Sequence, residues 1–183
     1  GSLIPRTIIE QEFFAEQQSV IAALVERREQ LDAEMEETRE EESGEDGLLK
    51  ELLTDNGELP KANLAKRIKE LEAKKTSPEV EALAALLERI DTAGTDELER
   101  IAATAPTIEA YGIRGRNRAI AKNKVKAALK AAAATAAMPE SYREEYDALI
   151  AYQAKLDEYD NLGKQIKQAQ KALDELVLEK YAA

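Results

Sequence analysis

The sequence predicts an all-α protein in which the N- and C-terminal helices form a long antiparallel coiled-coil helical hairpin, with a cluster of shorter helices between them. Ala, Glu, Leu and Lys dominate the 183 residues, and 34% of all residues are charged, which is typical of long helices. Aromatic residues reach only 4% and Trp is absent, so large rings cannot supply a compact core. Both ends of the chain repeat apolar residues at alternating spacings of three and four, the heptad pattern of packed helices.

These patterns divide the chain into four parts. We expect residues 1–6 to be a tag remnant and linker, because Gly1-Ser2 is typical of a cleaved expression tag. The natural protein would then begin upstream. The first long helix is predicted at residues 7–43 and the last at 139–183, packed against each other. Residues 44–138 hold the short helices, with a basic, Ala-rich helix near 118–137.

The first helix carries a seam, which is the row of heptad positions that faces a partner helix. Thr7 is the predicted N-cap, and Glu10 completes a capping box. The seam positions are Phe14, Gln17, Ile21, Leu24, Arg28, Leu31 and Met35. Nine acidic residues and one base lie between Asp32 and Asp46, where the helix dipole disfavours negative charge. We therefore expect fraying or a partner at this end.

Glycine and proline divide the next stretch. Gly44 and Gly47 are expected to end the first helix and to precede a short helix at 48–54. The Asp55-Asn56-Gly57 run predicts a turn, and its non-alternating neighbours favour a helix–helix connection over a hairpin. Pro60 suits the start of the helix that follows.

Capping residues mark two further short helices. Ser77 is a predicted N-cap followed by Pro78 at the first helical position. Gly94 is expected to close this helix. Thr95 is expected to cap another helix that runs to about Ala105, before an irregular stretch at 107–117.

Positive charge gathers in one stretch that has no acidic residue. Its bases are Arg114, Arg116, Arg118, Lys122, Lys124, Lys126 and Lys130, the candidate contacts to DNA phosphates. A solvated helix face and an electrostatic latch against the acidic run are the alternatives. The helix predicted at 118–137 has high propensity from alanine, but its apolar face of Ile120, Val125 and Leu129 is thin. We expect it to be the least core-like helix.

Pro139 starts the last helix, which carries the second seam. Its positions are Leu149, Tyr152, Leu156, Tyr159, Gly163, Ile166, Gln170, Leu173 and Val177. Two seams at opposite ends of one chain pair most simply antiparallel within the chain; pairing with other chains is the alternative. The residues predicted to form the interaction seam are Phe14, Ile21, Leu24, Leu31, Leu149, Leu156, Ile166, Leu173 and Val177.

No pattern of catalytic, cofactor-binding or metal-ligating residues is recognisable. Cys and His are absent, which excludes thiol nucleophiles, disulfides, Cys/His zinc sites and imidazole acid–base pairs. No apolar run approaches the roughly 20 residues that cross a bilayer, and no signal peptide is visible. We therefore expect a cytoplasmic protein with no membrane contact.

Several segments, mostly toward the two ends of the chain, resemble the sequences of one known family. They are IIEQEFFAEQQ at 8–18, GEDGLL at 44–49, DNGELPK at 55–61, LAKRIKEL at 64–71 and KALDELVLEKY at 171–181. In this order they resemble the C-terminal (distal) helical region of the DNA methyltransferase (modification) subunit of type I restriction-modification systems. The segment 77–138 is longer and richer in alanine than the corresponding region of the family.

The resemblance implies a role in a larger assembly. The full-length subunit would be an S-adenosylmethionine-dependent, site-specific DNA adenine N6-methyltransferase, whereas this fragment has neither the family's Asn/Asp-Pro-Pro-Phe/Tyr motif nor its Gly-rich cofactor loop. The fragment is thus expected to be no enzyme and to hold no cofactor. Its implied partners are the specificity subunit, the restriction subunit, and DNA through the complex.

The hypothesis that follows is a non-catalytic helical assembly module that docks the methyltransferase onto the specificity subunit and DNA. Two alternatives stay open at this stage. One is a nucleic-acid-binding helical module that uses the basic segment 114–130, and the other is a free-standing structural coiled coil. A homo-oligomer is compatible with each of them, because the same heptads serve pairing within and between chains.

Overall fold

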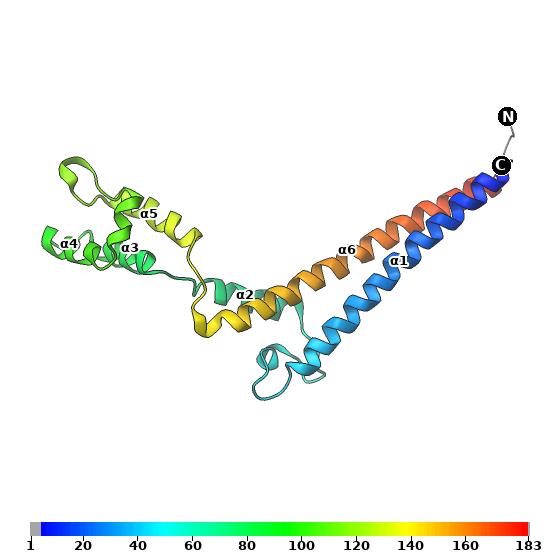
Figure 1. The fold of residues 1–183 in the computed structure, drawn as a ribbon, viewed down its shortest axis with the longest axis horizontal. Helices are drawn as coiled ribbons and strands as arrows, with labels where there is room; N and C mark the ends of the chain where they lie inside the picture. Colours follow the sequence, from blue (N-terminus) through cyan, green and yellow to red (C-terminus); the bar gives the residue numbers. More distant parts are fainter. Residues whose placement is uncertain (1–4, 183) are drawn as a thin grey trace. The chain divides into compact units, whose positions relative to one another are not determined.

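The structure, a computed structural model, describes residues 5–182, and their side chains up to residue 179. Its described part is all-helical, as predicted: a long helix at each end packs against the other, and shorter helices lie between them in the chain (Figure 1). None of the helices described is both long enough and apolar enough to cross a membrane.

The chain forms two compact units. The stalk unit comprises Gly1–Ala65 and Asp147–Ala183, and the small-helix unit comprises Lys66–Tyr146. Two helices, α2 (Lys61–Glu72) and α6 (Glu140–Ala182), contribute residues to both units.

In the stalk unit, α1 (Arg6–Glu41) runs antiparallel to α6. Side-chain contacts set the register: Arg27 binds Glu158 at 2.9 Å, Glu34 binds Lys155 at 3.5 Å, and Arg39 donates to the Tyr152 hydroxyl at 2.9 Å. Residue numbers rise along α1 as they fall along α6. The predicted pairing of the two long helices within one chain is confirmed.

The start of α1 differs from the prediction. The helix begins at Arg6 with Pro5 at the N-cap, and no side chain caps it. The Pro5 carbonyl accepts hydrogen bonds from the amides of Ile8 and Ile9 at 2.9 and 3.3 Å. Proline, with φ −56° and ψ 135°, already has the geometry of a residue that precedes a helix. Thr7 therefore lies inside the first turn, and the predicted capping box is wrong.

At its other end, α1 stays regular through the acidic run, so the predicted fraying is not observed. The Glu42 amide donates to Thr38 O at 3.0 Å, and the Glu42 carboxylate accepts from the Leu48 amide at 2.9 Å. The returning loop passes so close that a Cβ on Gly47 would lie 2.0 Å from Glu42 O. The predicted helix at 48–54 is reduced to one 3₁₀ turn, η1 (Lys50–Leu52).

The core of the stalk unit is concentrated at the end where α1 meets this loop and α2. Its buried side chains are Leu31, Met35, Leu49, Leu64, Leu149 and Tyr152. The turn before α2 is a connection between helices, as predicted: the Thr54 amide donates to Glu58 O at 2.8 Å, and Gly57 has φ +76°. Pro60 precedes α2 and its carbonyl accepts from the Leu64 amide at 3.2 Å.

The small-helix unit is built from α3 (Pro78–Arg89), α4 (Thr95–Ala103), the 3₁₀ helices η2 (Pro106–Tyr111) and η3 (Arg116–Arg118), and α5 (Lys122–Ala134). Ser77 caps α3 as predicted, accepting from the Val80 amide at 3.1 Å. Gly94 does not close α3; it is the N-cap of α4 with φ −76°, and Thr95 is the first residue of α4. An ordinary turn after Arg89 ends α3 instead, with the Ala93 amide on Arg89 O at 2.8 Å.

Helix α5 overturns the prediction that it would be the least core-like helix. It packs against α3, and Val125, Ala128 and Ala132 on one of its faces are 0%, 2% and 1% exposed. Alanine has no bulk beyond Cβ, so this face brings the two helices close together and needs no large side chains. The helix is also shorter than the predicted 118–137. Asn117 and Arg118 have positive φ and Ala121 has an extended backbone, so the helix begins only at Lys122.

Candidate interaction surfaces

The predicted seam residues lie between the two long helices. Leu31, Leu149 and Leu173 are buried, and the other six (Phe14, Ile21, Leu24, Leu156, Ile166 and Val177) are partly buried, while most residues around them are exposed. Of the polar seam positions, Gln170 is exposed. Leu162, which the heptad reading missed, is buried at 7% exposure. The seam is therefore occupied by the α1–α6 pair, so any partner must contact another face of the stalk.

The heptad register defines such a face on one side of the seam. Glu34 and Lys155 each precede a seam position by one residue, and they contact each other across the pair at 3.5 Å. Each heptad has two seam residues. In this antiparallel pair, the residue just before the first of them therefore lies on the same side of the stalk in both helices. Four large apolar residues share that heptad position: Phe13, Val20, Leu162 and Leu176. Leu162 is buried, and the other three are exposed.

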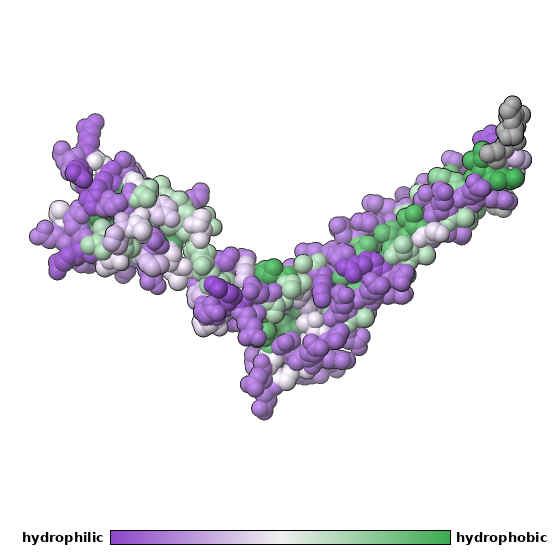
Figure 2. All heavy atoms as spheres, in the orientation of Figure 1, coloured by the Kyte–Doolittle hydropathy of each residue, from purple (hydrophilic) through white to green (hydrophobic). Residues whose placement is uncertain are grey.

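These three residues, called the apolar flank below, remain accessible to solvent. Phe13 is 47% exposed, Val20 48% and Leu176 42%. They lie near the start of α1 and the end of α6, at the end of the stalk opposite its buried core. Figure 2 shows hydrophobic residues at the surface of the α1–α6 pair there. Exposed apolar side chains that gather on one face mark interaction sites more often than scattered ones do.

Between the apolar flank and the buried core, the surface of the stalk carries charged side chains instead of apolar ones. Arg27 binds Glu158 through two hydrogen bonds of 2.9 and 3.1 Å. This hydrogen bonding raises the pKa of Arg27 and lowers the pKa of Glu158. The ion pair holds the register of the two helices in place, and the flank changes from polar to apolar along the stalk.

Part of the basic segment is held by ion pairs and hydrogen bonds within the small-helix unit. Arg114 forms two-pronged ion pairs with Glu99 at 2.7 and 2.8 Å and with Glu109 at 2.7 and 3.0 Å, and it also donates to Arg118 O at 2.8 Å. These hydrogen bonds lower the pKa of both glutamates and raise the pKa of Arg114. Arg114 therefore stabilises the loop before α5 and is not free to bind a phosphate.

Two more bases of this segment are engaged. Lys122 binds Asp91 at 2.9 Å, and Lys124 donates to Arg114 O at 2.7 Å. The carboxylates paired with the segment lie at 91, 99 and 109, not in the acidic run at 32–46. Four of the seven predicted contacts are exposed and form no hydrogen bond or ion pair through their side chains among the residues described: Arg116, Arg118, Lys126 and Lys130.

Between residues 5 and 179, no three acidic side chains come together in a way that would hold a metal ion. Comparison of the chain with protein-family models, with curated proteins and with solved structures finds no match.

Proposed function

We propose that the chain is a non-catalytic helical assembly module whose apolar flank docks a helix of a partner protein. The observation that carries this proposal is the exposure of Phe13, Val20 and Leu176 at one heptad position on one side of the stalk. A two-stranded pair that leaves a row of apolar residues beside its seam offers a ready surface for a third helix.

Covering the flank supplies part of the free energy that docking needs. Burying a Leu, Val or Phe side chain contributes about 1.5–3 kcal/mol. Each flank residue still exposes almost half of its surface, so each retains roughly 1 kcal/mol to be gained on docking. A partner helix adds contacts from the residues next to them, and micromolar binding needs about 8 kcal/mol in total.

The partner that we propose is the specificity subunit of a type I restriction-modification system. The support is the resemblance of residues 8–18 and 171–181 to the modification subunit, because these stretches carry Phe13 and Leu176, two of the three flank residues. In this proposal the module positions a methyltransferase domain, which uses S-adenosylmethionine, against the specificity subunit and DNA. The restriction subunit joins the same assembly.

Co-purification with a specificity subunit tests the docking. Leu176→Ser removes a flank residue, and Leu178→Ser is the matched control, because Leu178 is 67% exposed at the same end of α6 but off the flank. We expect Leu176→Ser combined with Phe13→Ser to abolish co-purification and Leu178→Ser to leave it intact. Equal effects of the two leucine variants, or none, would remove the basis for the flank.

The gene itself tests the family. If the reading frame upstream encodes a methyltransferase domain with an Asn/Asp-Pro-Pro-Phe/Tyr motif, the chain is part of a modification subunit. A frame without that domain leaves a structural coiled coil as the better description.

Binding of duplex DNA by the basic segment is the competing proposal, and it rests on its four unpaired bases. Removing Lys126 and Lys130 together should then weaken DNA binding and reduce its salt dependence. Absence of any gel shift at low salt would eliminate this alternative.

A further inference from the structure

Four bases surround a hollow in the stalk unit, away from the apolar flank. The hollow has a volume of about 510 Å³ and lies beside Gly163, where α1, α6 and the first residue of α2 meet. Its basic residues are Arg28, Lys61, Lys164 and Lys167, and Asp160 is the acidic one. Such a gathering of positive charge contrasts with a chain whose net charge is −11.

Arg28 is the most firmly placed of the four. Its Nε donates to Tyr159 O at 3.1 Å, and its guanidinium stacks on the Tyr159 ring at 3.9 Å from the centroid. It also lies flat against Gly163, where a Cβ would come within 2.9 Å of Nη2. The missing side chain at Gly163 therefore makes room for the guanidinium in the seam.

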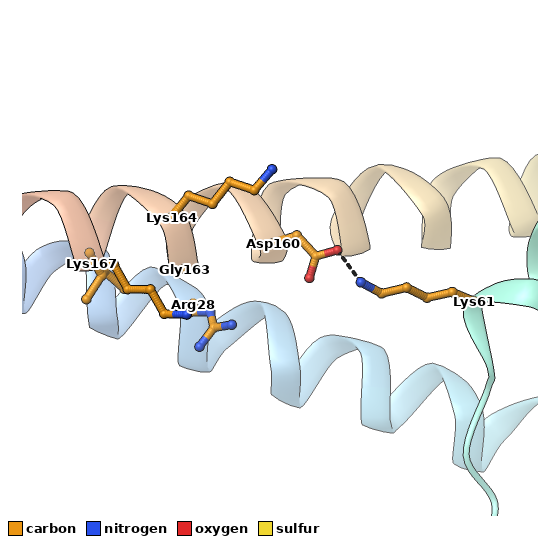
Figure 3. Close-up of a pocket in the computed structure, with 7 residues that line it drawn as sticks. Arg28, Lys61, Asp160, Gly163, Lys164 and Lys167 are labelled. Atoms are coloured by element: carbon orange, nitrogen blue, oxygen red, sulfur yellow. Dashed lines mark hydrogen bonds and ion pairs between the residues drawn. The ribbon is translucent and has the colours of Figure 1, made fainter.

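The terminal nitrogens of Arg28 have no hydrogen-bond acceptor among the described residues. The hollow's carboxylate is already used, because Asp160 binds Lys61 at 2.6 Å. Figure 3 shows Lys167 extended toward Arg28, the Lys61–Asp160 pair farther along the two helices, and the Lys164 ammonium pointing away from Arg28. Arg28, Lys164 and Lys167 thus line one hollow, and none of the three has an ion-pair partner among the described residues.

We propose that this hollow binds a phosphate group. A fixed guanidinium presents paired N–H donors in a fork that matches two phosphate oxygens, and the lysines add point charges that favour a dianion over a single carboxylate. The volume lies within the range of small-molecule sites, so it admits a nucleotide as well as a free phosphate. The backbone of a nucleic acid offers the same chemistry from a second source. The site is independent of the docking flank.

Calorimetric titration of the whole chain at low salt tests the site, with inorganic phosphate, ATP and a short DNA duplex as separate ligands. The first variant, Arg28→Gln, removes the fork. The second, Gly163→Ala, keeps every charge and displaces the guanidinium. It should also leave the melting temperature unchanged or higher, because alanine favours a helix more than glycine does. Lys69→Gln changes an exposed lysine of the other unit that belongs to neither proposed binding surface, and it is the control.

We expect saturable binding by the wild-type chain that both stalk variants weaken by about ten-fold or more, with no change in Lys69→Gln. Binding of phosphate or ATP assigns the site to a free ligand, and binding of the duplex alone assigns it to the nucleic-acid backbone. The proposal fails if none of the three ligands binds. It also fails if binding survives Arg28→Gln and Gly163→Ala, or if Lys69→Gln weakens it equally.

Discussion

Replacing Ala128 by leucine should destabilise the small-helix unit although it makes the core more hydrophobic. Ala128 is 2% exposed and lies between Val125 and Ala132 on the face of α5 that meets α3. Leucine adds three carbon atoms, which would contribute about 0.8 kcal/mol each if space were available. Where helices are in close contact there is no such space, and overpacking costs about 1–3 kcal/mol. For a chain of 183 residues, each kcal/mol lowers the melting temperature by roughly 2–4 °C.

The matched control is Ala131→Leu, the same substitution at an exposed position of the same helix. Both variants have nearly equal helix propensity, so the difference between them reports packing alone. Thermal unfolding followed by circular dichroism gives the two melting temperatures. An unchanged or raised melting temperature for Ala128→Leu would mean that α3 and α5 are not closely packed, and the account of α5 as a core helix would be refuted.

Three further predictions concern other parts of the chain. Gly47→Ala should cost at least about 1 kcal/mol in thermal unfolding, because its Cβ would meet a backbone oxygen at 2.0 Å, whereas Gly44→Ala has nothing within 4 Å and should be tolerated. The stability difference between wild type and Arg114→Gln should be largest at neutral pH and should shrink in acid unfolding curves below about pH 4.5, the usual pKa of its glutamate partners. Folding lowers the pKa of both carboxyls, so their contribution is present above the unfolded pKa and is lost as the pH falls through the folded one. Leu31→Ala, at a side chain that is 0% exposed, should cost about 2–5 kcal/mol in urea unfolding, and the partly buried Leu24→Ala should cost less.

The long helices and their seams were predictable from the sequence. Heptad spacing is a local property of the chain: residues three and four apart lie on one face of any helix, whatever surrounds it. Three of the nine residues predicted for the interaction seam are buried, and the other six are partly buried. Ser77 capped its helix for a similar reason, since a cap involves only the three residues that follow.

The sequence did not reveal which alanines would be buried. The buried Ala128 and the exposed Ala131 have the same chemistry and the same helix propensity, and only the approach of α3 distinguishes them. The pairing of Arg114 is likewise invisible in the sequence, because the fold brings its partners Glu99 and Glu109 to it.

The sequence by itself thus determined the helices, their amphipathic faces and the pairing of the two ends, because these depend on periodicity and on neighbours within one or two turns. Only the tertiary structure decided the burial of α5, the use of Arg114 and the gathering of Arg28, Lys61 and Lys167 around Gly163. Such contacts join residues far apart in the chain, and their energy depends on distances and packing that no local pattern encodes.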